Sequence, residues 1–583
     1  MAQVAYNNTF ASSYSTVWSS TCNIENIVFN INWQNATENS AFSLCAGLKQ
    51  LNNIRIPNFN TSKVTNMQYM FRGCENLKNL DMSDWNICNI VYVQDMFYGC
   101  RNLTNLNLSN WDVSKVERFA SFFAMCSGLT DVNLYGWNVS KAEDLDSLFV
   151  YDSALTNLIL PQIPFTNLTK IDLVFSGCNN LPSIDVSNWN VSKVNSFIRS
   201  FADCKALTTI NVGNWDMRNA ENLYYMFYGC NNLTALDIDK WTFSKNIKSL
   251  SSLLSRCRSL TSLNLTNWNT SVVNGKATEF LSECNRLTDV NFGTWDTTGF
   301  KDISFFFAGC GNLKNLDISN WNMVNCTNLY RTFASCSNLS QLDISHWNTH
   351  LVGSLGWAFL SCSNLKELNI GFWNVSNVKS MMETFSICSN LNTINLHNWN
   401  THNVTDMGGM FKSCFNLNNI ILSNNWNTHN VISMNNIFDY CSNMENFDMI
   451  LNWNTSKVNS LSAAFNECRN VKRISIDNWN VQNVVNTYRC FKNCSNITEL
   501  NISNWKLNKA TNITQMFSNC NNLSNATLIN IAKMCINAPL VTYKNLQNGN
   551  SYSPFRYSNK QINASTVGAD LINQLQSCGW VTN

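Results

Sequence analysis

The sequence predicts an α/β solenoid of about 19 repeats, and three observations support this prediction. Cysteine recurs every 26 or 27 residues, tryptophan keeps the same interval, and each interval holds an alternating apolar run followed by apolar residues spaced by three and four. A fixed period of roughly 20 to 50 residues is typical of solenoids and arrays. A single repeat of this size cannot bury its own apolar side, so neighbouring copies must stack around one continuous core.

The cysteine column sets the repeat boundaries. Small buried thiols explain it better than disulfide bridges, because copies on neighbouring helices are expected to exceed the roughly 4.4–6.8 Å between α-carbons that a bridge needs. Metal binding is disfavoured, since the cysteines form no C-x-x-C pair. The column comprises Cys45, Cys74, Cys100, Cys126, Asp152, Cys178, Cys204, Cys230, Cys257, Cys284, Cys310, Cys336, Cys362, Cys388, Cys414, Cys441, Cys468, Cys494 and Cys520.

Each repeat is expected to begin with a β-strand. In the repeat that starts at Leu103, Leu106 and Leu108 alternate with the polar Asn107, which is the period of a half-buried strand. The full pattern, L-x-x-L-x-L-x-x-W-x-V, places tryptophan where leucine-rich repeats carry an asparagine or cysteine that satisfies turn backbone groups. We therefore predict a leucine-rich-repeat solenoid in which the indole ring fills this corner and its N–H reaches a turn carbonyl.

A short helix is expected to follow each strand. Val116, Phe119, Phe123 and Cys126 are spaced by three and four, which is the stripe of an amphipathic helix. Ser114 precedes them, where its hydroxyl can cap the first free amides. Strands stack at about 4.8 Å whereas helix axes need about 8–10 Å. The sequence therefore predicts a parallel β-sheet on the concave side and short helices on the convex side.

Three segments are expected along the chain: an N-terminal cap over residues 1–44, the solenoid over 45–528, and a C-terminal cap or attachment module over 529–583. Within the solenoid, repeat 150–178 is irregular because Asp152 replaces the cysteine, the tryptophan is missing and two prolines interrupt the strand exit. Proline removes a donor and restricts its neighbour, so a bend is predicted here. The tail is expected to hold two helices, Ile529–Asn537 and Ser565–Ser577, the second ending at Gly579.

The repeat motif resembles that of a known family. Residues 109–116 read SNWDVSKV, and residues 381–391 read MMETFSICSNL. They resemble the BspA-like surface-protein repeats, a leucine-rich-repeat family with the pattern S-N-W-D-T-S-x-V-x-x-M-x-x-M-F-x-x-C-x-x-L that also has bacteriophage-encoded members. The likeness covers about residues 42–528. It implies a non-enzymatic repeat protein displayed on a surface, often in adhesion or host contact.

The ends of the sequence bear on where such a protein would act. The opening residues, MAQVAYNN, lack the basic and apolar stretches of a secretory signal, and no wall-sorting tail follows the array. A virion protein released by lysis needs neither. We therefore expect a virion or cell-surface location, and a cytoplasmic one otherwise.

Composition excludes several other function classes. Lys+Arg 39 against Asp+Glu 37 leaves a net charge of +2, too balanced for nucleic-acid binding. An apolar run long enough to insert into a membrane is also missing from the sequence. His350, His402 and His429 share one turn position. His402 and His429 lie in adjacent repeats and could share a metal ion, but no third ligand is apparent, so we expect polar turn residues rather than a metal site. Outward Asp and Asn alternate freely between repeats, which argues against a catalytic acid or base, and the sequence points to no cofactor.

The outward face of the sheet is the best candidate binding surface in the sequence. It is flat, polar and uncharged, which suits repeated weak contacts to an extended ligand such as a host surface glycan. The alternative interpretation is that threonine and asparagine simply fit exposed strand and turn positions. The first outward column carries Thr104, Thr130, Thr156, Thr208, Thr234, Thr261 and Thr288.

Two hypotheses for function follow. The first is a surface-binding or adhesion protein, virion-borne as a receptor-binding or fibre protein, whose partner is a host surface glycan or protein. The second is a structural virion or filament component whose solenoid acts as a spacer or assembly scaffold among other virion proteins. Either leaves room for oligomerisation through the terminal regions.

Overall fold

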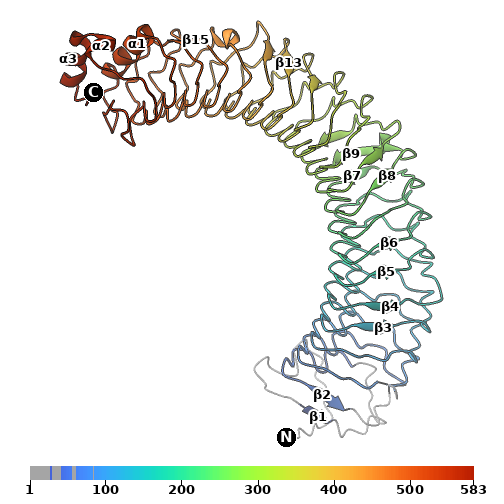
Figure 1. Ribbon diagram of the computed structural model, residues 1–583. Coiled ribbons are helices and arrows are strands. Elements are labelled where there is room, and N and C mark those ends of the chain that lie inside the picture. The colour runs from blue at the N-terminus through green and yellow to red at the C-terminus, as the bar shows by residue number, and fades with distance from the viewer. Residues whose placement is uncertain (1–25, 29–40, 56–60, 83–84, 583) are drawn as a thin grey trace. The chain divides into compact units, whose positions relative to one another are not determined.

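The computed structural model describes residues 26–28, 41–55, 61–82 and 85–582. Within them the chain winds into stacked coils, each about one repeat long (Figure 1). The coils group into two compact units, residues 1–295 and 296–583, which are built on the same plan. The predicted leucine-rich-repeat solenoid is confirmed, in the form of a parallel β-solenoid with few helices.

The first part of each coil, from the leucine after the column cysteine to the tryptophan, is the strand segment. Its strands pair in parallel with the equivalent residues of the next coil, so that Leu368, Ile394 and Ile420 lie in register. The first unit contains β1 (Asn26–Val28), β2 (Asn53–Arg55), β3 (Asp131–Asn133), β4 (Asn157–Ile159), β5 (Ser183–Ile184), β6 (Thr209–Ile210), β8 (Ser262–Asn264) and β10 (Asp289–Asn291). The second contains β12 (Glu367–Asn369), β13 (Thr393–Leu396), β14 (Asn419–Leu422), β15 (Arg473–Ser475) and β16 (Glu499–Asn501).

Regular strands occur in fewer coils than the expected 19. Elsewhere the strand segment is reduced to single bridges, such as Asn79 to Asn105, or to a 3-10 turn, η3 (Asp448–Ile450). Two to four paired residues per strand suffice because the coil is also held on its other side.

The second part of each coil, from the tryptophan to the column cysteine, forms the turn segment. It opens with a second parallel ladder, in which Ser354 pairs with Ser380 and Ser380 with Asp406. The elements of this ladder are β7 (Ile247–Ser249), β9 (Val273–Lys276) and β11 (Phe300–Asp302), and η2 (Thr270–Val272) precedes β9.

A run of tight turns then replaces the predicted helix. In residues 67–73, every second backbone N–H donates to a carbonyl 25 residues later, over 2.7–3.1 Å. The N–H groups between them close turns, as Met70 does onto the carbonyl of Met67. Two residues per coil, four apart, adopt the left-handed conformation, for example Tyr69 (φ 59°) and Gly73 (φ 73°).

The prediction of convex-side helices is therefore wrong. The spacing by three and four is shared by both structures, because Met67, Met70, Phe71 and Cys74 are all buried in the turn segment. The backbone donors that would close a helix serve the next coil instead. The prediction of a concave sheet depended on the wider spacing of helix axes, so it loses its basis when tight turns replace the helices.

The cost of placing a non-glycine residue in the left-handed conformation can be tested by substitution. Ile387 adopts φ 62° with a half-exposed side chain, although a β-branched residue is strained there. Ile387→Gly is expected to stabilise the protein by about 0.5–1 kcal/mol, measured as a higher urea midpoint. Ile432→Gly is the control, because Ile432 is similarly exposed but lies outside the left-handed region, and this change should destabilise. Equal losses from both changes would contradict the prediction.

The core consists of aligned columns. The Phe333 and Phe359 rings stack at 5.4 Å, and the Trp347 and Trp373 rings at 5.9 Å. The Trp373 indole N–H donates to the Ile344 carbonyl of the preceding coil over 2.9 Å, which confirms the predicted role of the indole. The Cys362 thiol donates to the Phe333 carbonyl over 3.1 Å. The column cysteines are thus small buried groups that also join neighbouring coils.

Asparagine joins the coils at their surface. The Asn364 side chain donates to Asn338 and the Asn390 side chain to Asn364, each over 3.3 Å. At the turn after the tryptophan, the Asp112 carboxylate accepts the Ser114 backbone N–H over 3.1 Å. Ser114 is therefore a donor in a local turn rather than the expected helix cap.

The irregular repeat 150–178 keeps the stack intact. The Phe149 ring stacks on Phe123 at 5.1 Å and on Phe175 at 5.6 Å. The Tyr151 backbone N–H donates to the Ser176 carbonyl over 2.7 Å. These contacts match those of regular coils and offer no support for the predicted bend.

Asp152 is the distinctive feature of that repeat. Its side chain is fully buried, and its Oδ1 accepts the Cys126 backbone N–H over 2.7 Å. Its Oδ2 is buried without a hydrogen-bond partner. Burial raises the pKa of the Asp152 carboxyl well above its usual range, which favours the protonated form in the folded chain.

Asp152→Cys is expected to stabilise the protein at pH 7. The unfolded chain releases the Asp152 proton above about pH 4 while the folded chain keeps it, so stability falls by about 1.4 kcal/mol per pH unit up to the folded pKa. Urea midpoints of the variant and wild type should therefore diverge from pH 4 to pH 7. Asp152→Asn is the control: it should remove this pH dependence without supplying the thiol donor. A constant gap across this pH range would refute the assignment.

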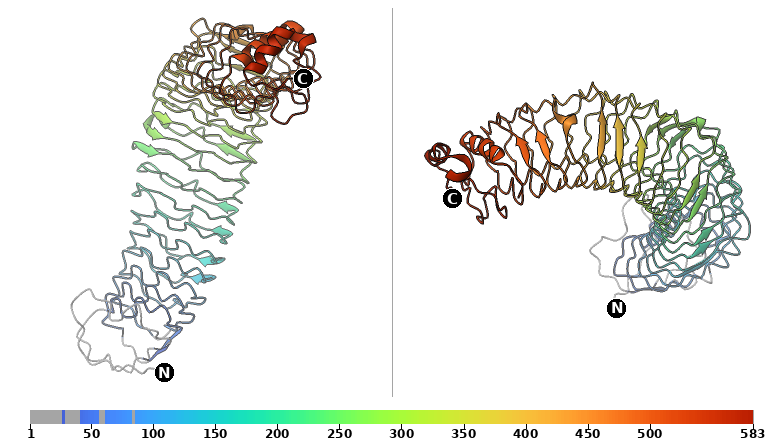
Figure 2. Two further views of the ribbon diagram at one scale, coloured as in Figure 1. Left: turned by 90° about the vertical axis from the view of Figure 1, so that its left-hand side faces the viewer. Right: turned by 45° about the horizontal axis from the view of Figure 1, so that its top comes forward.

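The C-terminal tail lies against the last coil. It contains α1 (Asn525–Ile536), α2 (Ala564–Val567) and α3 (Ala569–Ser577), gathered at the end of the second unit (Figure 2). The first predicted helix is confirmed, and the second is divided at Gly568. The Phe517 N–H donates to the Pro554 carbonyl over 2.8 Å, which is the bond that a further coil would otherwise supply.

Most of the N-terminal segment 1–44 lies outside the described residues. Its described strand β1 pairs in parallel with β2, which lies in the solenoid.

Candidate functional site

The seven predicted threonines lie in one column of the strand segment. All are exposed except Thr130, which is half-buried. Several donate their hydroxyl hydrogen to the backbone of the preceding coil, as Thr156 does to the Thr130 carbonyl over 3.2 Å and Thr288 to the Thr261 carbonyl over 3.0 Å. Such threonines keep only acceptor lone pairs for a ligand. Their hydrogen bonds favour a structural role in joining coils.

The outward residues of the turn segment form a different surface. We define this turn face as the residues one, two, five and six places before each column cysteine. It varies from coil to coil, whereas the strand segment repeats asparagine and threonine. Its aromatic and arginine members are Tyr69, Arg72, Tyr98, Tyr151, Arg199, Tyr224, Tyr225, Tyr228, Arg256, Phe305, Tyr330, Arg331, Trp357, Tyr440, Tyr488 and Arg489.

The predicted site did not include the turn face, because these positions were assigned to the outside of helices. A signal was available in the sequence, since aromatic and arginine residues recur at these positions. Tryptophan, tyrosine and arginine are the residues most enriched in binding hot spots.

In the first unit, arginines of the turn face pack on tyrosines. The Arg72 guanidinium lies 4.3 Å from the Tyr98 ring centre and forms an ion pair with Asp95 over 2.5 Å. The Arg256 guanidinium lies 5.2 Å from the Tyr228 ring centre.

Arg256 is also neutralised by an acidic partner. Its Nε lies 3.2 Å from Glu283, whose other carboxylate oxygen is 2.5 Å from Arg258. Together these arginines lower the pKa of the Glu283 carboxyl, although its partial burial acts in the opposite direction. The Arg256 guanidinium thus has a carboxylate partner within the chain.

In the second unit, four residues form what we call the arginine platform: Phe305, Tyr330, Arg331 and Trp357. The Arg331 guanidinium carbon lies 5.6 Å from the ring centres of Phe305 and Tyr330 and 5.1 Å from that of Trp357. The rings also contact one another, with Tyr330 5.3 Å from Phe305 and 5.2 Å from Trp357. All four side chains are half-buried.

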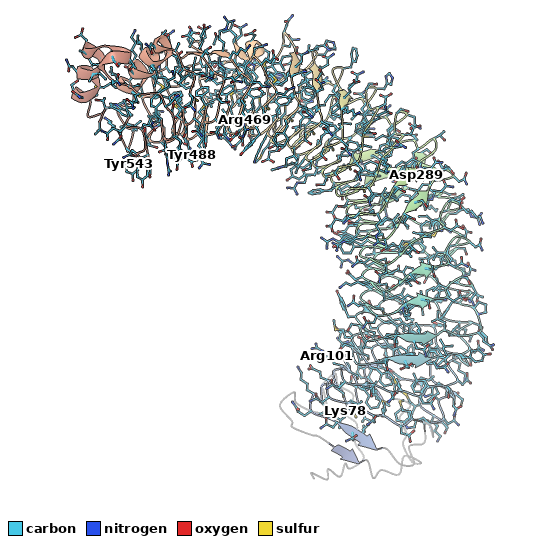
Figure 3. All side chains as sticks on the ribbon, viewed as in Figure 1. Lys78, Arg101, Asp289, Arg469, Tyr488 and Tyr543 are labelled. Atoms are coloured by element: carbon cyan, nitrogen blue, oxygen red, sulfur yellow. The ribbon has the colours of Figure 1, made fainter. Side chains whose placement is uncertain are left out.

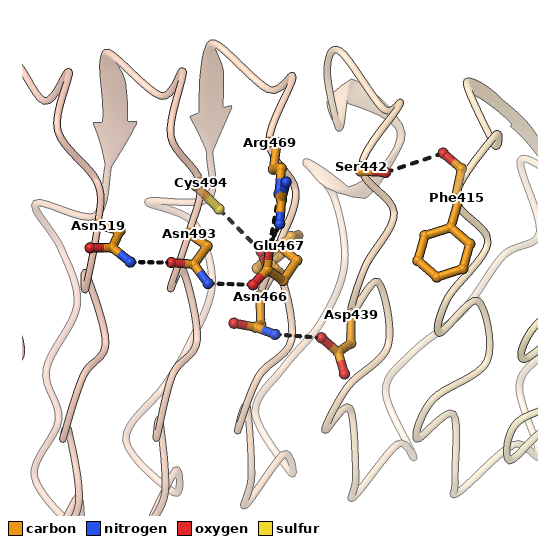
Figure 4. Close-up of polar contacts among 10 residues, drawn as sticks. Phe415, Asp439, Ser442, Asn466, Glu467, Arg469, Asn493, Cys494 and Asn519 are labelled. Carbon is orange, nitrogen blue, oxygen red and sulfur yellow. Dashed lines mark hydrogen bonds and ion pairs between the residues drawn. The ribbon is translucent and has the colours of Figure 1, made fainter. Parts of the chain in front are cut away.

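A polar network occupies the turn face further along the second unit (Figure 4). The Asn466 amide donates to the buried Asp439 carboxylate over 2.7 Å, and Arg469 donates to the buried Glu467 over 2.8 Å. Asn493 also donates to Glu467. Burial raises the pKa of the Asp439 carboxyl, against the opposing effect of the Asn466 hydrogen bond. These groups mainly satisfy one another, which favours a structural role.

Aromatic residues continue beyond this network. The Arg489 guanidinium carbon lies 4.7 Å from the Tyr488 ring centre. It lies on the same side of the second unit as Tyr543 of the tail (Figure 3).

The histidines take part in turn hydrogen bonds. The Nδ1 atoms of His350 and His402 lie 2.9 and 3.1 Å from the side-chain oxygens of Asn348 and Asn400. Across the described ranges, no group of three or more His, Cys, Asp and Glu side chains is placed to hold a metal ion. In the same residues, none of the helices combines the length and apolar character that crossing a membrane requires.

Comparison with models of protein families shows which family the chain belongs to. The model of a family described as "Mycoplasma protein of unknown function, DUF285" matches residues 37–161, 160–268, 229–342, 276–367, 327–447 and 419–531. The chain belongs to the DUF285 family. This assignment confirms the resemblance to BspA-like surface-protein repeats. A search of curated proteins gave no match.

Solved structures with a similar repeat fold include three bacterial proteins. A leucine-rich repeat protein from Bacteroides ovatus is 16% identical over 64% of this chain and 79% of that one, with a TM-score of 0.30. A leucine-rich cell surface protein from Faecalibacterium prausnitzii is 14% identical over 69% and 79%, with a TM-score of 0.26. An internalin from Listeria monocytogenes is 18% identical over 55% and 81%, with a TM-score of 0.17.

Proposed function

We propose that this DUF285 protein is a non-enzymatic binding or adhesion protein that attaches a cell or virus particle to a surface ligand through its turn face. The observation that carries the proposal is the contrast between two outward surfaces. The strand segment uses its polar groups to join coils, whereas the turn face presents variable aromatic and arginine side chains. Family membership supports the broad assignment to leucine-rich-repeat surface proteins.

The stacked coils suit such a role physically. The turn-face side chains stand on backbone that is hydrogen-bonded to neighbouring coils, so little conformational entropy is lost on binding. Repetition along the solenoid adds multivalency, which strengthens weak contacts to an extended partner. A host surface glycan or protein is the partner that we propose, and a virion-borne receptor-binding or fibre protein is the setting in which a lysis-released chain would meet it.

Binding of the full chain to host cells and their purified surface polysaccharides tests the proposal. Tyr224→Ser with Tyr228→Ser on the turn face is expected to weaken binding at least tenfold. Thr208→Val with Thr234→Val on the strand segment is the control, in the same coil and the next, and should change binding less than twofold. Equal losses from both pairs, or binding by neither cells nor polysaccharides, would overturn the proposal.

A second candidate function is assembly through the C-terminal tail, in a virion or filament. It is favoured by exposed apolar residues there: Leu540 is 57% exposed and Tyr557 is 58% exposed. The rings of Tyr543 and Tyr552, both also exposed, stack at 4.0 Å. Light scattering of the full chain tests this role, since Tyr543→Ser with Leu540→Ser should dissociate an assembled form. A monomeric wild-type chain would exclude it.

A further inference from the structure

We infer that the arginine platform of Phe305, Tyr330, Arg331 and Trp357 binds the carboxylate-bearing sugar residues of an acidic polysaccharide. This inference rests on the proposed binding function and names its ligand class and one of its sites.

The charge of Arg331 is the first argument. In the part of the chain that the structure describes, Arg331 forms no ion pair, and its Nε is buried without a hydrogen-bond partner. Arg72 and Arg256 also pack on tyrosines, but each has a carboxylate beside it. A guanidinium is always protonated and presents its donors as a planar fork that fits a carboxylate. An unpaired positive charge held in this way calls for an anionic partner from outside.

The aromatic surroundings are the second argument. Three rings surround the guanidinium at 5.1–5.6 Å and so hold it in place. Ring faces of this kind offer a flat apolar surface against which the C–H face of a sugar can pack. One ligand unit that has both an apolar face and a carboxylate would use both features, which describes a uronic or similar acidic sugar.

The backbone around the platform favours a sugar over an acidic peptide. The N–H groups of Arg331 and Trp357 donate to the carbonyls of Gly356 and Met382 in the following coils. The backbone donors in these two residues are thus already used, and a peptide strand finds none of them available for pairing. A sugar needs only the ring faces and the guanidinium.

The test compares immobilised polygalacturonate, its methyl ester and neutral dextran as partners of the full chain. The wild type is expected to bind polygalacturonate at least tenfold more tightly than either neutral polymer. Arg331→Met and Trp357→Ala should each lose at least tenfold. Arg218→Met is the control, because that guanidinium lies outside the turn face and is paired with Asp216 over 2.6 Å, and it should bind like the wild type. Unchanged urea midpoints would show that the platform variants remain folded.

Other outcomes separate this inference from the proposed function. Equal binding to polygalacturonate and its ester, or unchanged binding by Arg331→Met, would overturn the inference. So would polyglutamate competing as well as the acidic sugar polymer. If the chain binds host cells but soluble polygalacturonate does not compete, the binding function stands and the acidic-sugar site is wrong.

Discussion

Raising the pH from 8 to 10.5 is expected to unfold the solenoid without added denaturant. The column holds 18 cysteines, and their thiols are buried. Burial raises the pKa of the Cys74, Cys388 and Cys520 thiols to about 12. An unfolded thiol ionises near pH 8.5–9, so unfolding is increasingly favoured as the pH rises from there toward the folded pKa.

The free-energy cost of the buried thiols is large compared with the stability of one coil. At pH 10.5, each buried thiol costs the folded state about 2 kcal/mol relative to the unfolded chain. A coil of 26 residues contributes about 1–4 kcal/mol of net stability. One thiol per coil therefore removes a large part of what holds that coil, and it does so throughout the array. The loss should appear as a steep fall in circular dichroism between pH 9 and 11.

Thiol reactivity supplies the control for this transition. Cys88 is exposed and should react with a thiol reagent at pH 8 at once. The column thiols should react only together with the loss of structure. Rapid reaction of the column at pH 8, or an intact spectrum at pH 12, would show that the thiols are not buried donors.

The sequence was sufficient to predict the parts of the fold that depend on side-chain periodicity. The cysteine and tryptophan columns, the buried strand positions and the stacking of repeats all follow from a fixed interval of apolar residues. Periodicity did not distinguish a helix from a run of tight turns, because both bury positions i, i+3, i+4 and i+7. The distinction lies in where the backbone donors go, and Met67 donates to the next coil rather than within its own.

The positions of glycine distinguish a run of tight turns from a helix, but the prediction from the sequence did not use them. Glycine directly precedes the column cysteine in several repeats, and it takes a positive φ there. A helix would place glycine after its last turn, not one residue before a buried core position. The glycines in question are Gly73, Gly99, Gly177, Gly229 and Gly309.

The candidate site was harder to predict for a related reason. Threonine was singled out because it recurs, and recurrence in a solenoid marks positions that the stack itself needs: Thr156 and Thr288 bond to the preceding coil. Residues that vary, such as Arg331 and Trp357, carry no periodic signal. Only the contacts between neighbouring coils bring them together with Phe305 and Tyr330.

Trp373→Ala is expected to be among the most destabilising single substitutions, at about 3–5 kcal/mol. The side chain is 1% exposed, its ring stacks on Trp347 at 5.9 Å, and its N–H bonds to the Ile344 carbonyl. Truncation opens a cavity in the column and removes one of the two donors to that carbonyl, which keeps the Trp347 backbone N–H. The neighbouring Phe372 is 68% exposed, so Phe372→Ala should change stability by less than about 0.5 kcal/mol. Urea midpoints measure both.

Two further variants separate the causes. Trp373→Phe keeps a ring in the stack but removes the indole donor, so it should lose less stability than Trp373→Ala. The difference between the two losses measures the contribution of ring packing. Trp347→Ala combined with Trp373→Ala should cost less than the sum of the two single changes, because the rings contact each other and their cavities merge. Strict additivity would mean that each coil keeps its own core, whereas coupling would show that stability is shared along the tryptophan column.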